Sequence, residues 1–136
     1  MRRPTGAEAR AAAWTLRAIA SCRRQLASST VAEVDLPSAA HLPATAEPAV
    51  PAVLRLLRRR CLTSALVLQA WRADHGEALD VVIGVTAPSA GFTAHAWLDD
   101  GAALSRGGDG FEPLHRVPPR RSTAQRPPDR SSPERR

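Results

Sequence analysis

Cys61 and His95 are the two side chains of this sequence best suited to covalent chemistry. A cysteine attacks a carbonyl carbon in its thiolate form, and a histidine close by is the usual base that removes the thiol proton. An acidic side chain that holds the imidazole in one tautomer completes such a site. The chemistry of this set is acyl transfer through a thioester, with water or an amine as the acceptor.

Cys61 opens a segment that is apolar on nearly every side, 61–74, directly after three consecutive arginines. The unpaired N–H groups of a helix start and nearby guanidinium groups both favour thiolate over thiol. The N–H groups of Cys61 and Leu62 would also be placed to bind the oxyanion of a tetrahedral intermediate. A cysteine in an apolar setting is more often an inert core residue, so this position alone does not establish a nucleophile.

His95 lies in the middle of an expected strand, Phe92–Leu98, whose alternate residues form one wholly apolar face. His95 shares the other face with Trp97, which either packs in the core or lines a substrate cleft. A single histidine on a sheet is more often only hydrogen-bonded. The combination is more specific, because a helix-start cysteine, a strand-borne histidine and then an Asp-rich turn is the order that Cys-His-Asp hydrolases use.

The elements that must position Cys61 are helical. Helical spacing of apolar residues predicts a first helix over 7–27, and Pro, Ser and Ala then indicate a connector over 28–48. A shorter helix is expected from Ala49 or Pro51 to Arg59. The helix over 61–74 should be central, and Gly76 ends it because glycine tolerates the left-handed turn that closes a helix.

The elements that must position His95 are strands. Period-two patterns predict strands over 80–85 and 92–98, joined as an antiparallel hairpin by a loop that contains Pro and Gly. A third strand is expected around 102–105 and a short last one over 111–117. The sequence therefore predicts an α+β fold in which the Cys-bearing helix packs on a small antiparallel sheet.

We divide the chain into residues 1–47, the first helix and connector, residues 48–117, the catalytic core, and residues 118–136, a disordered tail rich in Arg and Pro. The tail holds six arginines and two acidic residues, so it carries four of the six net positive charges. The rest is nearly neutral, and we do not expect a nucleic-acid ligand. The alternative is a tail that binds an acidic partner or RNA.

Other features restrict the setting. Two widely separated cysteines, no zinc-type spacing and no signal peptide favour a reducing cytoplasm. We interpret Cys22 as an inert helix residue. No apolar run is long enough to cross a bilayer, and no phosphate-binding or dinucleotide motif is present, so we expect neither membrane insertion nor a bound cofactor or metal.

The runs 59–69, 80–85 and 91–98 together resemble the lasso-peptide maturation B protein, the leader peptidase of those pathways, in the transglutaminase-like superfamily. The resemblance covers about 54–117, and its strongest motifs are the Cys-Leu helix start and the Ala-His-Ala-Trp strand. It implies a cysteine peptidase that removes the leader from a ribosomally made precursor peptide. It also implies two partners, a separate leader-recognition protein and an asparagine-synthetase-like cyclase.

The same resemblance implies site residues. Cys61 matches the nucleophile of the family and His95 its general base. The family's orienting Asp falls in register near Arg106, which makes Asp109 the nearest acid and our choice for the third catalytic residue. Asp99 and Asp100 are the alternatives, and we interpret both as turn residues. Two other functions stay open, an acyltransferase on the same fold and a non-catalytic module that presents the precursor to the cyclase.

Overall fold

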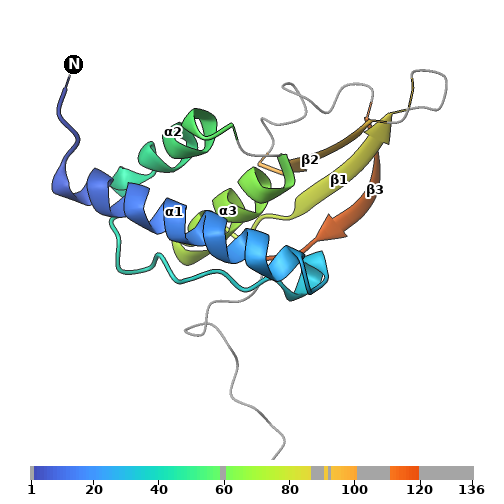
Figure 1. Cartoon of the computed structure of the whole chain (residues 1–136), viewed down its shortest axis with the longest axis horizontal. Helices are drawn as coiled ribbons and strands as arrows, with labels where there is room; N and C mark the ends of the chain where they lie inside the picture. Colours follow the sequence, from blue (N-terminus) through green and yellow to red (C-terminus); the bar gives the residue numbers. More distant parts are fainter. Residues whose placement is uncertain (1, 59–60, 87–90, 92, 101–110, 120–136) are drawn as a thin grey trace, which may run out of the picture.

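The computed structural model describes residues 2–58, 61–86, 91, 93–100 and 111–119. Helix α3 lies between helices α1 and α2 on one side and a three-stranded antiparallel sheet on the other (Figure 1). The expected α+β fold, with the Cys-bearing helix packed on a small antiparallel sheet, is confirmed. Within the described ranges, no helix combines the length and the hydropathy that crossing a bilayer requires.

Helix α1, Gly6–Leu26, begins with a capping box. The Thr5 hydroxyl accepts a hydrogen bond from the Glu8 backbone N–H at 3.2 Å, and the Glu8 carboxylate accepts one from the Thr5 N–H at 2.7 Å. These bonds satisfy donors that have no partner inside the helix. The bond from the Thr5 backbone also lowers the pKa of Glu8. One face of α1 is buried, and it carries Ala11, Trp14, Ala18, Ile19 and Cys22.

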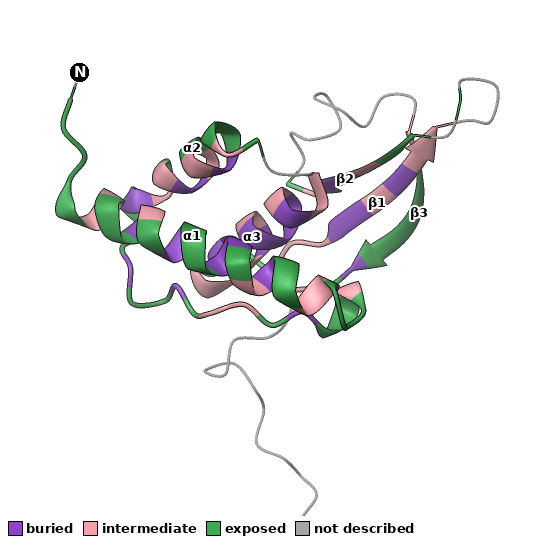
Figure 2. Cartoon of the chain, viewed as in Figure 1, coloured by how far each residue is buried: buried purple, intermediate pink, exposed green. Residues whose placement is uncertain are grey.

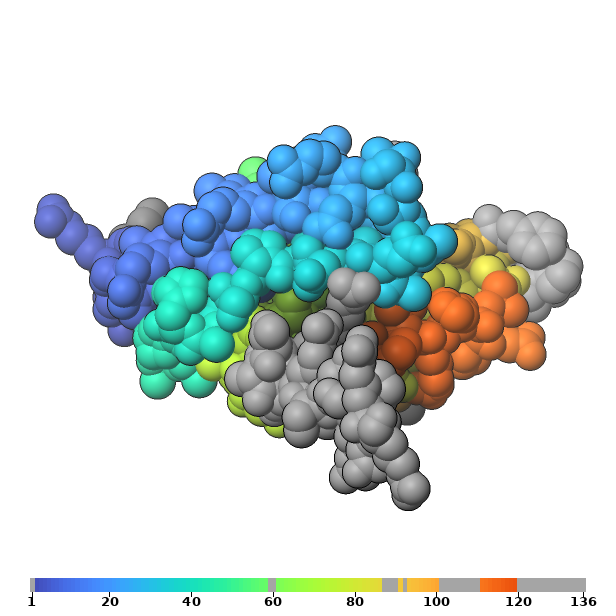
Figure 3. All heavy atoms as spheres, turned by 90° about the horizontal axis from the view of Figure 1, so that it is seen from below, coloured from blue at the N-terminus to red at the C-terminus, as the bar shows by residue number. Residues whose placement is uncertain are grey.

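The proline-rich connector lies along α1, as the space-filling view from below shows (Figure 3). It contains only two short 3-10 helices, Val31–Glu33 and Ala44–Ala46. Side chains hold it in place, because the Gln25 amide makes hydrogen bonds with both the N–H and the carbonyl of Asp35, at 2.8 and 2.7 Å. Helix α2, Ala49–Leu56, follows and packs on α1 and α3.

Helix α3, Cys61–Asp74, is the centre of the fold. One side joins α1 and α2 in an apolar cluster, where the Trp14 and Trp71 rings meet edge to face with centroids 5.5 Å apart. The other side packs on the sheet. The helix ends as expected, since Gly76 has a φ of 92°.

The sheet has the order β2-β1-β3, with β1 at Val81–Thr86, β2 at Ala94–Leu98 and β3 at Phe111–Val117. All pairings are antiparallel, so the expected hairpin of the first two strands is confirmed. The last strand also lies where the sequence predicted it. The expected strand around 102–105 falls outside the described residues.

The two faces of the sheet differ in what covers them. The inner face packs on α3 through Val81, Ile83, Ala96, Leu98 and Val117. By alternation along each strand, the outer face carries His95, Trp97 and Phe111. In Figure 2, the residues of β1 are buried or partly buried, whereas β3 is exposed along most of its length. Cys61 therefore packs against the inner-face cluster, whereas His95 projects from the outer face of the sheet.

Candidate active site

The thiol of Cys61 lies at the edge of strand β2, the outer strand of the sheet formed by the described residues. Backbone bonds between Thr86 and Thr93, and between Asp99 and Asp80, fix which residues of the hairpin are hydrogen-bonded pairs. Because bonded and non-bonded pairs alternate in an antiparallel ladder, the Ala96 N–H points away from β1. It donates to the Cys61 sulfur at 3.4 Å. The thiol is thus held in the plane of the sheet, beside the residue that follows His95.

The start of α3 adds to this environment. Cys61 is a free cysteine, partly buried, and it packs against the apolar cluster of the inner face. As the first residue of α3, it lies where backbone N–H groups have no acceptor inside the helix. These groups and the Ala96 N–H all favour negative charge at the sulfur or on an oxygen atom beside it. Arg59 and Arg60, two of the preceding arginines, lie outside the described residues.

His95 projects from the outer face and is partly buried between aromatic rings. Its ring lies 5.9 Å from the Trp97 ring, with 23° between the planes, and 5.3 Å from the Phe111 ring, centroid to centroid. The directly opposite residue on β1 is Gly84. Among the described residues, neither ring nitrogen of His95 has a hydrogen-bond partner.

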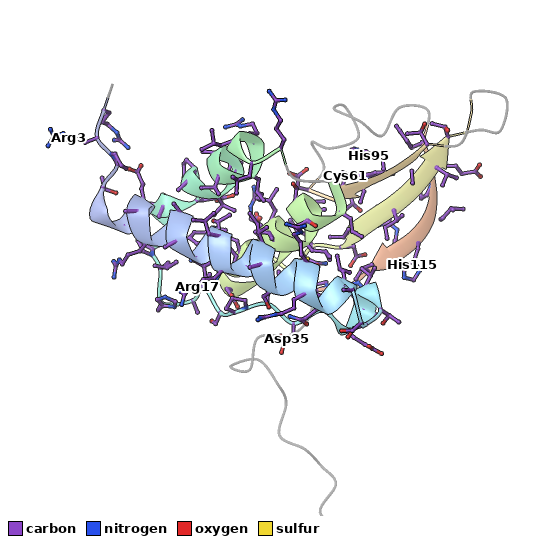
Figure 4. The ribbon with its side chains drawn as sticks, in the orientation of Figure 1. Arg3, Arg17, Asp35, Cys61, His95 and His115 are labelled. Atoms are coloured by element: carbon purple, nitrogen blue, oxygen red, sulfur yellow. The ribbon has the colours of Figure 1, made fainter. Side chains whose placement is uncertain are left out.

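Cys61 and His95 lie next to each other where α3 meets β2 (Figure 4). No hydrogen bond joins these two described side chains, because the backbone of β2 separates the outer face from the edge. Rotation about the Cα–Cβ bond of His95 is the movement that brings the imidazole over this edge. Catalytic hydrogen bonds are often long or absent before substrate binds, so this arrangement is compatible with a nucleophile–base pair.

The acidic candidates divide into two groups. Asp109, our first choice for the third residue, lies outside the described residues. Asp99 binds Arg116 instead of His95, with 2.8 Å between the carboxylate and the guanidinium, and this bond raises the pKa of Arg116. The Asp100 N–H donates to the Leu98 carbonyl. The Asp99 N–H donates to the Asp80 carbonyl, which continues the ladder between β1 and β2, and the roles of Asp99, Asp100 and Asp109 stay predictions.

The second cysteine has a contrasting environment. Cys22 is fully buried in the cluster that joins α1, α3 and the sheet. Burial raises the pKa of its thiol, against a smaller opposite effect of a hydrogen bond with Thr63. A buried neutral thiol is a poor nucleophile, so the interpretation of Cys22 as an inert residue agrees with its position.

Sequence reasoning missed two residues of the site, Gly84 and Phe111. Both contact the aromatic group around His95, and neither carries a chemical group that draws attention in a sequence. Phe111 is far from His95 along the chain, so the sequence alone does not indicate that their rings are in contact. The Gln69 amide donates to the Leu79 and Val117 carbonyls, which ties α3 to the sheet.

Other binding features lie elsewhere or are absent from the described part of the chain. A cavity of about 110 Å³ lies between the connector, α3 and residues 117–119, and neither Cys61 nor His95 lines it. Within the described ranges, no group of three or more His, Cys, Asp or Glu side chains is arranged to hold a metal ion.

Comparison with known proteins gives one match. The family model described as the transglutaminase-like superfamily matches residues 6–119, which is most of the chain and includes α1 as well as the site. No curated protein and no solved structure matches the chain significantly.

Proposed function

We propose that this chain, which belongs to the transglutaminase-like superfamily, is a cysteine peptidase that removes the leader from a ribosomally synthesised lasso-peptide precursor. Proteins of the superfamily are commonly cysteine hydrolases or acyl transferases. The observation that carries the proposal is the 3.4 Å bond from the Ala96 N–H to the Cys61 sulfur. It fixes a helix-start thiol beside the strand position of a histidine.

In the proposed acylation step, His95 takes the proton of the Cys61 thiol, and the sulfur attacks the scissile carbonyl carbon. The electron pair of the C=O bond moves to oxygen, and N–H groups of the first turn of α3 donate hydrogen bonds to this oxyanion. When the intermediate collapses, the C–N bond breaks. The His95 imidazolium gives its proton to the leaving amine, which is the new N-terminus of the core peptide.

In the proposed deacylation step, a water molecule gives a proton to His95 and attacks the thioester. The C–S bond then breaks, the leader leaves as a carboxylic acid, and His95 returns the proton to sulfur. Each proton is accounted for by the imidazole, so the reaction requires no cofactor. An acid that orients the imidazole, with Asp109 as our candidate, would hold it in the productive tautomer.

The choice of a leader peptide as substrate is supported by the motifs, not by the fold. The Cys-Leu start of α3 and the Ala-His-Ala-Trp strand resemble those of the lasso-peptide leader peptidases. The same resemblance supports two partners, and we propose that a separate protein recognises the leader and that an asparagine-synthetase-like cyclase takes the released core peptide.

The direct test compares the two free cysteines. A candidate precursor is incubated with the chain and both partners, and mass spectrometry follows the masses of leader and core peptide. Cys61→Ala should abolish cleavage, whereas Cys22→Ala should retain it in the folded fraction. Unchanged leader removal by Cys61→Ala would show that the chain only presents the precursor.

An added primary amine separates hydrolysis from transfer, because both reactions pass through the same thioester. We expect the free carboxylic acid of the leader as the product, even with the amine in excess. A leader that carries the amine as an amide, without hydrolysis, would identify an acyltransferase and contradict the peptidase proposal.

A further inference from the structure

The position directly across the sheet from His95 is occupied by a glycine. Gly84 on β1 pairs with His95 on β2, and both belong to the outer face. The space that a side chain of residue 84 would take is filled by the six-membered ring of Trp97. A Cβ built on Gly84 would lie 2.8 Å from Cη2 and 2.9 Å from Cζ3 of this ring, and 2.9 Å from the backbone carbonyl oxygen of Glu112 on β3, closer than real Cβ contacts come.

Trp97 therefore reaches back from β2 across the central strand. It is only 7% exposed, and its ring lies 6.4 Å from the Phe111 ring of β3. The His95 ring contacts both rings. Three side chains from two strands that do not pair with each other thus meet above Gly84, and they do so because that residue has no side chain.

We infer that Gly84 and Trp97 are positioning residues for the His95 imidazole. A histidine opposite a glycine has empty space beside it over the neighbouring strand, and an imidazole that turned into this space would point away from Cys61. Trp97 fills the space, and Phe111 borders it. The imidazole is thereby kept off the central strand and on the side of β2, the strand against which the Cys61 thiol lies.

This inference rests on the proposed function, because it gives the aromatic group a purpose only if His95 is the base. It adds a requirement that the family match does not contain: the residue opposite the base must lack a Cβ. A displacement of a catalytic group by about 1 Å can cost roughly 100-fold in rate, so a small shift of the Trp97 ring should be measurable.

The readout is alkylation of Cys61 by iodoacetamide, which needs no knowledge of the natural substrate. The thiolate is the reacting form, and a neighbouring imidazolium favours it. Trypsin cleaves after Arg, so Cys61 and Cys22 appear in the separate peptides 61–72 and 18–23, and mass spectrometry follows each alone. Rates are measured on the full chain from acid to neutral pH.

Three variants test the positioning. Gly84→Ala should push the Trp97 ring out of place, and Trp97→Phe should leave part of the space empty. Each should lower the rate of Cys61 alkylation below neutral pH by about 10-fold or more, through loss of the oriented base. In the double variant the smaller ring relieves the close contact with residue 97 but not the one with the Glu112 carbonyl oxygen, so it should recover only part of the rate lost in Gly84→Ala.

A merely structural role would give a different pattern. Gly6→Ala is the matched control, because a Cβ there meets nothing within 4 Å, and it should leave the rate and its pH dependence unchanged. Thermal unfolding shows which variants fold, and if Gly84→Ala does not, Trp97→Phe and the double variant decide. Wild-type alkylation profiles in the folded variants would overturn the inference.

His95→Ala separates this inference from the proposed function. If His95→Ala slows alkylation and the Gly84 and Trp97 variants do not, only the positioning inference fails. If His95→Ala itself leaves the rate and its pH dependence unchanged, His95 is not the base and both proposals fail.

Discussion

The inner and outer faces of the sheet carry out different tasks with residues from the same strands. The inner face is apolar and is covered by α3, so its residues stabilise the fold. The outer face carries an imidazole, aromatic rings and an ion pair, and these groups form part of the candidate active site and its surroundings. Period-two alternation makes this division possible, because neighbouring residues of one strand serve opposite faces.

The edge of β2 is where these tasks meet. Ala96 buries its methyl group on the inner side, while its N–H reaches the Cys61 sulfur at the edge. His95 precedes it and faces outward. If the two faces are as separate as their environments indicate, outer-face variants should change reactivity with little change in stability, and inner-face variants should do the reverse.

The largest expected effect is on the outer face. His95→Ala should lower the rate of peptide cleavage by about 10²- to 10⁴-fold, since it removes the proposed general base. The free energy of unfolding, measured with urea, should change little. His115→Ala is the matched control, because His115 is exposed on β3. Equal loss of activity in both variants would contradict the assignment of His95.

The next effect is on the inner face. Leu98→Ala should lower the free energy of unfolding by about 2–5 kcal/mol, because Leu98 is only 7% exposed and its truncation leaves a cavity. Leu114→Ala, at a position 67% exposed on β3, should change it by less than about 0.5 kcal/mol. Both folded proteins should alkylate Cys61 at the wild-type rate. A slower reaction in folded Leu98→Ala would show that the faces are coupled.

The two cysteines extend the comparison to pH. Burial raises the pKa of Cys22, so the folded chain favours its neutral thiol. This contribution to stability is fully present below the ordinary value of 9.0 and is lost as the pH rises through the higher folded value. Cys22→Ala should therefore make stability less dependent on pH above 9. In the wild type, iodoacetamide should modify Cys61 first and Cys22 only after unfolding.

The smallest effect concerns the ion pair of the outer face. Asp99→Asn should change the free energy of unfolding by about 0.5 kcal/mol or less, because both partners are partly exposed and exposed ion pairs contribute little. Cleavage should stay near the wild-type rate, since Asp99 binds Arg116. A loss of activity comparable to that of His95→Ala would instead make Asp99 the orienting acid.

Much of this protein was predictable from the sequence. Helical spacing and the position of Gly76 predicted α3 with its start at Cys61, and alternation predicted a strand in which His95 and Trp97 share one face. These are local properties, because the period of apolar residues and the chemistry of helix ends depend on neighbours in the chain. The third catalytic residue was not predictable in this way, since the register that the resemblance implies falls at Arg106, which is not an acid.

Only the tertiary structure decided how the parts meet. The local sequence does not indicate that the Ala96 N–H points away from β1 toward Cys61 of α3. It also does not indicate that Phe111 lies against His95. The order β2-β1-β3 determines both, because it makes β2 an edge strand and brings β3 alongside Gly84. The sequence thus determined the thiol and the imidazole, and long-range pairing of strands decided that the thiol lies at the strand that carries His95 and that Gly84 and Phe111 lie beside the imidazole.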